Sequence, residues 1–140
     1  RFTKNSAYLE AAHKIARFIM ENRPSENDYI PYWDYDAPVT KETPRDVSAA
    51  SVTASAMIEL STMVPNGQKY LDYAEKILKS LSSDAYLAKV GDNQGFILMH
   101  SVGSLPNGSE IDTPLNYADY YYLEALKRFM DLKGINYKDI

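Results

Sequence analysis

Apolar residues recur at helical spacing in four stretches of the chain, at 5–22, 47–63, 67–82 and 115–132. Residues three, four and seven positions apart lie on one face of an α-helix, so such a stripe predicts an amphipathic helix. The chain is therefore expected to be all-α. The first stripe comprises Tyr8, Ala11, Ala12, Ile15 and Ile19 with the flanking Phe18, and the third comprises Tyr70, Leu71, Ala74, Ile77, Leu78 and Leu81.

Short polar residues stand where these helices begin, and their side chains can accept hydrogen bonds from free first-turn amides. The expected caps are Asn5 or Ser6, Asp46 or Ser48, and Asn66. Gly134 follows the last helix, where a left-handed residue commonly ends a helix.

The stretch 47–63, "VSAASVTASAMIELSTM", is rich in alanine and serine. Small side chains let neighbouring backbones approach closely, so this helix is expected in a crowded interior. In the last helix, Tyr121 and Tyr122 lie on the apolar stripe and are expected to fill space between helices, whereas Tyr120 lies one step off it.

Between the helices, residues 23–46 form a long loop with prolines at positions 24, 31, 38 and 44. Long loops in compact domains are often functional, and the aromatic residues of this loop argue against disorder. Residues 83–94 are expected to carry a short helical turn, 95–101 to be extended, and 102–114 to be loop. The aromatic residues of the long loop are Tyr29, Tyr32, Trp33 and Tyr35.

Composition narrows the class of function. The 140 residues carry a formal charge of −4, and the 15 Lys and Arg residues are scattered, which argues against a nucleic-acid partner. No apolar stretch approaches the length of a membrane span, so no membrane partner is expected. The absence of cysteine excludes disulfides and thiolate metal sites but leaves the compartment open.

Few residues offer catalytic chemistry. His13 is expected at the surface and His100 in the shaping of a pocket, and neither belongs to a cluster with metal-ligand spacing. Neither a metal nor a cofactor is expected. Asp36 and Asp46 are interpreted as turn and helix caps rather than as acid–base residues. Trp33 and Tyr120 could instead form stacking and hydrogen-bonding walls for a carbohydrate.

Four segments, in order, resemble one known family. They are "PYWDYDAP", "TPRDVSAASVTASAMIEL", "GFILMHSVGSLPNG" and "IDTPLNYADYYYLEALKRF", and together they resemble the C-terminal part of the unsaturated glucuronyl hydrolases, glycoside hydrolase family 88. The related unsaturated rhamnogalacturonyl hydrolases, family 105, share parts of the pattern and stay as an alternative.

The resemblance implies that residues 1–140 form one helical segment, the C-terminal part of an (α/α)6 barrel of six helical hairpins. Helices 5–22 and 67–82 would be outer helices, and 47–63 and 115–132 inner ones. Family members remove a 4,5-unsaturated uronic acid from oligosaccharides left by polysaccharide lyases. They hydrate the enol ether double bond, and an aspartate donates the proton and activates water.

The same resemblance implies which residues bind substrate and which are missing. Tyr120 matches a substrate-contacting tyrosine. Some relatives that accept sulfated substrates carry Ser-x-x-Ser-x-Lys before the last helix, where this chain has Ser104, Asn107 and Ser109 and lacks the lysine. The family's catalytic aspartates lie upstream of these 140 residues, so the segment alone is expected to be inactive.

Two classes of function therefore remain at this point. In the first, the chain pairs with a missing N-terminal part of the barrel, or self-associates through its inner helices, and contacts an unsaturated oligosaccharide. In the second, it is a non-catalytic helical-hairpin module that binds a carbohydrate or a protein partner.

Overall fold

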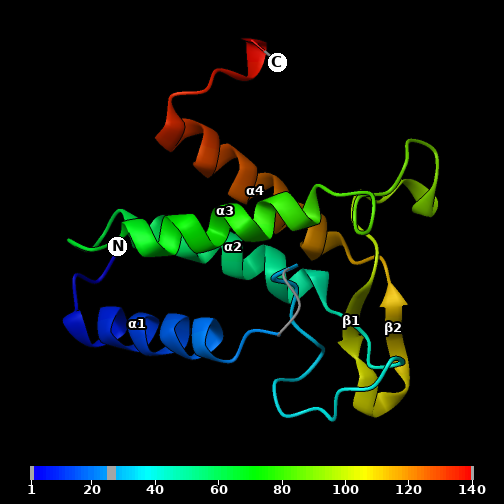
Figure 1. Cartoon of the computed structure of the whole chain (residues 1–140). Helices are drawn as coiled ribbons and strands as arrows, with labels where there is room; N and C mark the ends of the chain where they lie inside the picture. The colour runs from blue at the N-terminus through cyan, green and yellow to red at the C-terminus, as the bar shows by residue number, and fades with distance from the viewer. Residues whose placement is uncertain (1, 25–27, 140) are drawn as a thin grey trace.

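The computed structural model describes residues 2–24 and 28–139, and four α-helices dominate this part of the chain (Figure 1). Each helix begins and ends within two residues of the range predicted from the sequence, which confirms the helical spacing as the main signal. The helices are α1 (Ser6–Glu21), α2 (Val47–Ser61), α3 (Gln68–Leu81) and α4 (Asn116–Lys133), and a 3₁₀ turn, η3 (Tyr137–Asp139), follows them.

Two of the three predicted N-terminal caps are confirmed. Asn5 accepts a hydrogen bond from the Ala7 amide at 2.9 Å, and Asp46 accepts one from the Ser48 amide at 2.9 Å. The third prediction, Asn66, is wrong, because Gly67 occupies the cap position of α3 without any side-chain hydrogen bond. The chain turns so tightly here that a side chain at position 67 would overlap the backbone of the last residue of α2.

Helix α2 lies at the centre of the molecule and packs against both α3 and α4 (Figure 1). Its small side chains, such as Ala50 and Ala54, are fully buried, so the predicted crowded interior is confirmed. Close backbone approach then lets the larger side chains of α3 and α4 fill the space around it. The buried core includes Val47, Ile58, Ile77, Leu81, Leu98, Ala118, Tyr122 and Ala125.

Helix α1 lies at the edge of this core, and only Ala16 of the helix is buried. The apolar stripe expected to be covered is largely exposed, since Tyr8, Ile15 and Phe18 are 67%, 60% and 49% exposed. Leu9, Ala12, Ile19 and Met20 are the partly buried residues that join α1 to the core. The helical period predicted for α1 is confirmed. Within the described residues, however, only part of its apolar stripe is covered by other elements.

The segment 102–114, expected to be loop, contains a β-hairpin, and that expectation is wrong. Strand β1 (Ser101–Ser104) pairs antiparallel with β2 (Ser109–Thr113), and the 3₁₀ turn η2 (Leu105–Asn107) connects them. A bulge interrupts the register between Ser101 and Val102. Most side chains of β2 are exposed, so the sequence lacks the apolar alternation that identifies a strand.

Residues 83–101, before the hairpin, agree better with the secondary structure predicted from the sequence. A short 3₁₀ turn, η1 (Asn93–Gly95), overlaps the region where a helical turn was predicted. Leu98, in the segment predicted to be extended, forms an isolated bridge with Leu87 and is fully buried.

Backbone contacts join the middle of the long loop to its C-terminal end. Tyr32 and Arg45 form an antiparallel bridge, and the Trp33 amide donates to the Pro44 carbonyl at 3.1 Å. The turn cap assigned to Asp36 belongs to Asp34, whose Oδ1 accepts from the Asp36 amide at 2.7 Å. An aspartate caps a turn through the amide two residues further on, which explains the shift.

Candidate functional site

Two carboxylates fix the segment that leads into the hairpin. Asp46, at the start of α2, is 8% exposed. Its Oδ1 accepts from the Ser48 amide and hydroxyl and, at 3.3 Å, from the Val102 amide. The predicted helix cap is confirmed, and the same carboxylate also ties β1 to α2.

The second carboxylate is Asp119, in the first turn of α4. Its two oxygens accept from the backbone amides of Ile97 and Leu98 at 2.8 and 2.9 Å. The Val47 amide donates to the His100 carbonyl at 3.2 Å from the other side. Segment 97–102 is therefore held between the first turns of α2 and α4. This role of Asp119 has no local signal in the sequence, because the Leu98 amide lies 21 residues away along the chain.

His100 lies at the base of the hairpin, with Nδ1 at 2.5 Å from the Oδ1 of Asp112. Both residues have positive φ, at 69° and 52°, in the left-handed region that side chains rarely adopt. The rings of His100 and Tyr86 lie nearly perpendicular, with centroids 6.2 Å apart. The imidazole and the carboxylate remain 44% and 60% exposed, so this pair can contact a ligand.

Ser104 and Asn107 come together at the tip of the hairpin. The Nδ2 of Asn107 donates to the Ser104 hydroxyl at 2.8 Å, and Gly108, at φ 64°, closes the turn. Asn107 is exposed and Ser104 is partly exposed. Amide and hydroxyl groups in this position can form hydrogen bonds with a polyhydroxylated ligand.

Tyr120, near the start of α4, is 61% exposed, and its ring meets that of Tyr121 edge-on at 5.1 Å. Tyr122 is buried, and its hydroxyl is 2.8 Å from the Ser82 hydroxyl. The prediction that Tyr122 fills space between the helices is confirmed. Tyr121, for which the same was predicted, is half-buried. Within the described residues, no hydrogen bond or ring contact joins Tyr120 to the hairpin.

Trp33 is half-buried in the long loop and is tethered through its backbone rather than its ring. The described contacts do not bring it together with Tyr120. The proposed pair of carbohydrate-binding walls therefore has no direct support from the structure. Consecutive parts of the chain contribute these candidate residues: the His100–Asp112 pair lies at the base of the hairpin, the Ser104–Asn107 pair at its tip, and Tyr120 in α4, which follows the hairpin.

A charged cluster between α2 and α4 had no signal in the sequence. The guanidinium of Arg128 donates to the Ser55 carbonyl at 2.9 Å and to its hydroxyl at 3.0 Å. It also pairs with Glu59 at 3.0 Å and with Glu124 at 3.2 Å. The cluster fixes the two helices to each other.

The described residues contain no group of three or more side chains arranged to hold a metal ion. His13 is half-buried, and its Nδ1 lies 2.7 Å from the Tyr70 hydroxyl, which accounts for it structurally. Among the described helices, none combines the length and apolar character needed to cross a bilayer.

Comparison with known proteins identifies clear relatives, although no family model matches the chain. An unsaturated glucuronyl hydrolase of Formosa agariphila is 46% identical over 132 residues, which is 94% of this chain and 33% of the relative. The chain thus spans about one third of the length of the curated relatives it matches.

Solved structures agree in fold. A crystal structure described as an unsaturated glucuronyl hydrolase specific for heparin matches 95% of this chain and 36% of its own, with TM-score 0.91 and 59% identity. A Streptococcus agalactiae unsaturated glucuronyl hydrolase mutant complexed with dGlcA-GalNAc6S matches 82% of this chain and 31% of its own. Its TM-score is 0.73 and its identity is 28%. The predicted fold class, helical hairpins of an (α/α)6 barrel, is confirmed.

Proposed function

This chain belongs to the unsaturated glucuronyl hydrolases, glycoside hydrolase family 88, and we propose that it forms the C-terminal part of the barrel of such an enzyme. In this proposal residues 1–140 are one helical segment of a larger domain. The observation that carries it is the match of 95% of the chain to a family structure at TM-score 0.91.

The role of this segment is to bind and orient the substrate. Tyr120 presents an exposed ring and hydroxyl near the start of α4, as expected of a substrate-contacting tyrosine. His100 and Asp112 offer an imidazole and a carboxylate at the base of the hairpin, and Ser104 and Asn107 offer polar groups at its tip. Trp33, half-buried in the long loop, belongs to this proposal as an additional wall.

The reaction of the complete enzyme is the hydration of an enol ether double bond in a 4,5-unsaturated uronic acid. A carboxyl group protonates the double bond and a water molecule adds to it, after which the hydrated sugar opens and leaves. The aspartates for proton transfer lie outside these 140 residues. We therefore expect this segment alone to be inactive.

The substrate is an unsaturated oligosaccharide released by a polysaccharide lyase. Relatives differ in their named substrates, since one similar structure is described as specific for heparin and several relatives are unsaturated chondroitin disaccharide hydrolases. Identity is 59% to the former and between 24% and 30% to the three chondroitin enzymes compared. A heparin-derived unsaturated disaccharide is therefore the preferred substrate in our proposal.

A chimera tests the function directly. The matching third of the Formosa agariphila relative would be replaced by this chain, and turnover would be followed as loss of the ultraviolet absorbance of the conjugated double bond. Turnover is expected in the chimera and not in the isolated chain. A folded chimera without turnover would contradict the proposal.

Single substitutions in that chimera test the binding role. Tyr120→Phe should raise KM, because it removes one hydroxyl that contacts substrate, and should leave the melting temperature unchanged. Tyr137→Phe, on an exposed tyrosine beyond α4, is the matched control. Equal kinetics for the two variants would exclude Tyr120 from the site.

A further inference from the structure

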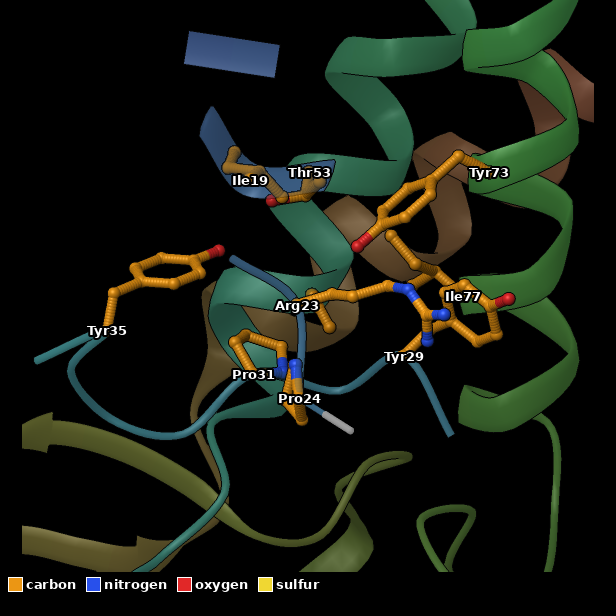
Figure 2. A pocket seen from close by; sticks show the side chains of 10 residues that line it. Ile19, Arg23, Pro24, Tyr29, Pro31, Tyr35, Thr53, Tyr73 and Ile77 are labelled. Atoms are coloured by element: carbon orange, nitrogen blue, oxygen red, sulfur yellow. The ribbon is translucent and has the colours of Figure 1, made fainter. Parts of the chain in front are cut away.

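The base of the hairpin combines exposed polar groups with backbone angles that side chains rarely adopt. His100 and Asp112, whose side chains are 44% and 60% exposed, have φ of 69° and 52°. Strained positions of this kind cluster at functional sites. By contrast, the small pocket between the end of α1, the long loop and α3 has a volume of about 10 Å³, room for one water-sized group (Figure 2). A sugar ring cannot enter that pocket, whereas the hairpin base is open to solvent.

A β-bulge determines where the Asp112 carboxylate lies. Ser101 of β1 pairs with Thr113 of β2. The next pair joins Val102 to Ile111, so Asp112 is the extra residue of the bulge. A bulge residue with positive φ is commonly glycine, because glycine adopts this conformation without strain. Here the position carries a carboxylate instead, and bulges often re-aim a side chain beside an active site.

Ser101 adds a second unfavourable feature at the same place. The residue is fully buried, and within the described residues its hydroxyl has no hydrogen-bond partner. Burial of a hydroxyl without a partner costs free energy, so stability alone does not account for the geometry of this segment. What that geometry achieves is the contact between His100 and Asp112.

The hydrogen bond between these two side chains determines which ring nitrogen carries hydrogen. The Oδ1 of Asp112 lies 2.5 Å from the Nδ1 of His100. An ionised carboxylate can only accept, so Nδ1 must carry the hydrogen and donate it. The ring of Tyr86, which is 8% exposed, packs beside the imidazole at 6.2 Å between centroids. Nε2 is then the nitrogen available to a ligand, since no described residue forms a hydrogen bond with it.

The charge of the hairpin decides which ligand group suits Nε2. Residues 101–113 contain two carboxylates, Glu110 and Asp112, and neither lysine nor arginine. These carboxylates would repel an anionic group but not a hydroxyl. A hydroxyl can also both donate and accept, so it can pair with Nε2 whether or not that nitrogen carries a hydrogen.

We propose that Nε2 of His100 binds a hydroxyl of the saccharide substrate and that Asp112 is a positioning residue, which acts through the imidazole and does not itself contact the sugar. The identity of the ligand rests on the proposed function. The role of Asp112 toward His100 rests on the hairpin alone.

Nitrogen-15 NMR of the purified chain tests the role of Asp112 without any turnover. The chain has two histidines, so the ring signals of His100 and His13 can be assigned by substitution. At pH ~9, above the ordinary titration range of histidine, the hydrogen of His100 should lie on Nδ1. Asp112→Gly should move it to Nε2, where free histidine prefers it. Glu110→Gly removes an equal charge from the same strand, at φ 51°, and should leave the tautomer unchanged.

Kinetics of the chimera test the contact with substrate. Asp112→Gly and His100→Asn, in which asparagine tolerates positive φ, should each raise KM at least about threefold with little change in kcat. The double variant should resemble either single variant, because Asp112 acts through His100. Glu110→Gly should leave KM within about twofold of wild type.

Four results would overturn the inference: hydrogen on Nε2 of His100 in the wild-type chain, equal tautomer changes in Asp112→Gly and Glu110→Gly, multiplied KM effects in the double variant, or an unchanged KM in His100→Asn. A His100→Asn effect that fades as salt rises would contradict the hydroxyl and assign an anionic group to Nε2.

Folding and turnover are controlled separately. If thermal melts show that Asp112→Gly does not fold, Asp112→Ala removes the same acceptor and decides between the outcomes. Because the NMR measurement needs no turnover, a chimera without activity would contradict the proposed function, whereas a wrong tautomer would contradict the role of Asp112.

Discussion

Asp119 on α4 accepts the backbone amide of Leu98 at 2.9 Å and fixes the segment before the hairpin to the helix that carries Tyr120. The same carboxylate accepts the Ile97 amide at 2.8 Å. Together with the Asp46 carboxylate and the Val47 amide, this side chain therefore sets the position of the segment that leads into the hairpin. The geometry of the proposed substrate wall depends on this contact between two elements that are distant in the sequence.

Replacing Asp119 with alanine should destabilise the chain by about 1–3 kcal/mol, because two part-buried amides lose a charged acceptor. Urea denaturation would measure the free energy of unfolding. Asp131→Ala removes an exposed carboxylate paired with Lys127 on the same helix and should cost less than about 0.5 kcal/mol. Equal effects of the two substitutions would show that the Asp119 contacts contribute little.

Arg128 and its neighbour Lys127 offer a second matched pair. Arg128→Met should destabilise by about 1–3 kcal/mol, since it leaves Glu124 and Ser55 without their cationic donor between α2 and α4. Lys127→Met breaks only an exposed pair and should be near neutral. The prediction fails if denaturation midpoints of the two variants coincide.

Substitution of two tyrosines near the start of α4 should affect stability differently. Tyr122→Phe is expected to lower the free energy of unfolding by about 1 kcal/mol, because the part-buried hydrogen bond with the Ser82 hydroxyl is lost. Tyr120→Phe should leave stability unchanged, since its ring is 61% exposed. Thermal denaturation of both variants of the isolated chain would check this, and a loss of stability on Tyr120→Phe would assign that residue to packing.

Tyr73 should make the chain sensitive to alkali. Burial, and secondarily the nearby Tyr35, raise the pKa of Tyr73 to about 12, although Arg23 lowers it. Since the folded state holds the proton more tightly than the unfolded state, the contribution of Tyr73 to stability is complete below pH ~10 and is lost as pH rises toward ~12.

The corresponding experiment compares urea midpoints of wild type and Tyr73→Phe across that pH window. The variant should lose less stability than wild type between pH ~10 and ~12, and Tyr137→Phe should behave like wild type. Parallel curves for Tyr73→Phe and wild type would contradict the assigned pKa.

Exposed apolar side chains on α2 and α4 should cause the isolated chain to self-associate. Val52 and Leu123 are 39% and 51% exposed on the helices proposed as inner barrel helices. Apolar patches of this kind favour association, because burial is worth roughly 25 cal/mol per Å². Light scattering should show dimers or larger species, and Val52→Lys with Leu123→Lys should shift them toward monomer. If the wild-type chain is monomeric in dilute solution, this prediction is wrong.

The amino-acid pattern alone determined the helices. Apolar spacing set all four ranges, and local chemistry set the ends at Asn5, Asp46 and Gly134, because these signals depend on neighbours within a few residues. The burial of Tyr122 and the exposure of Tyr120 followed from the same helical period. The family resemblance followed from four motifs in order, and similar proteins confirm it.

The hairpin and the long-range side-chain contacts were evident only from the tertiary structure. The hairpin escaped prediction because its short, exposed strands carry no apolar alternation. The roles of Asp119 and Arg128 depend on residues brought together from distant parts of the chain. Burial and hydrogen-bond partnership are properties of the packed chain, so the sequence specifies them only through the fold.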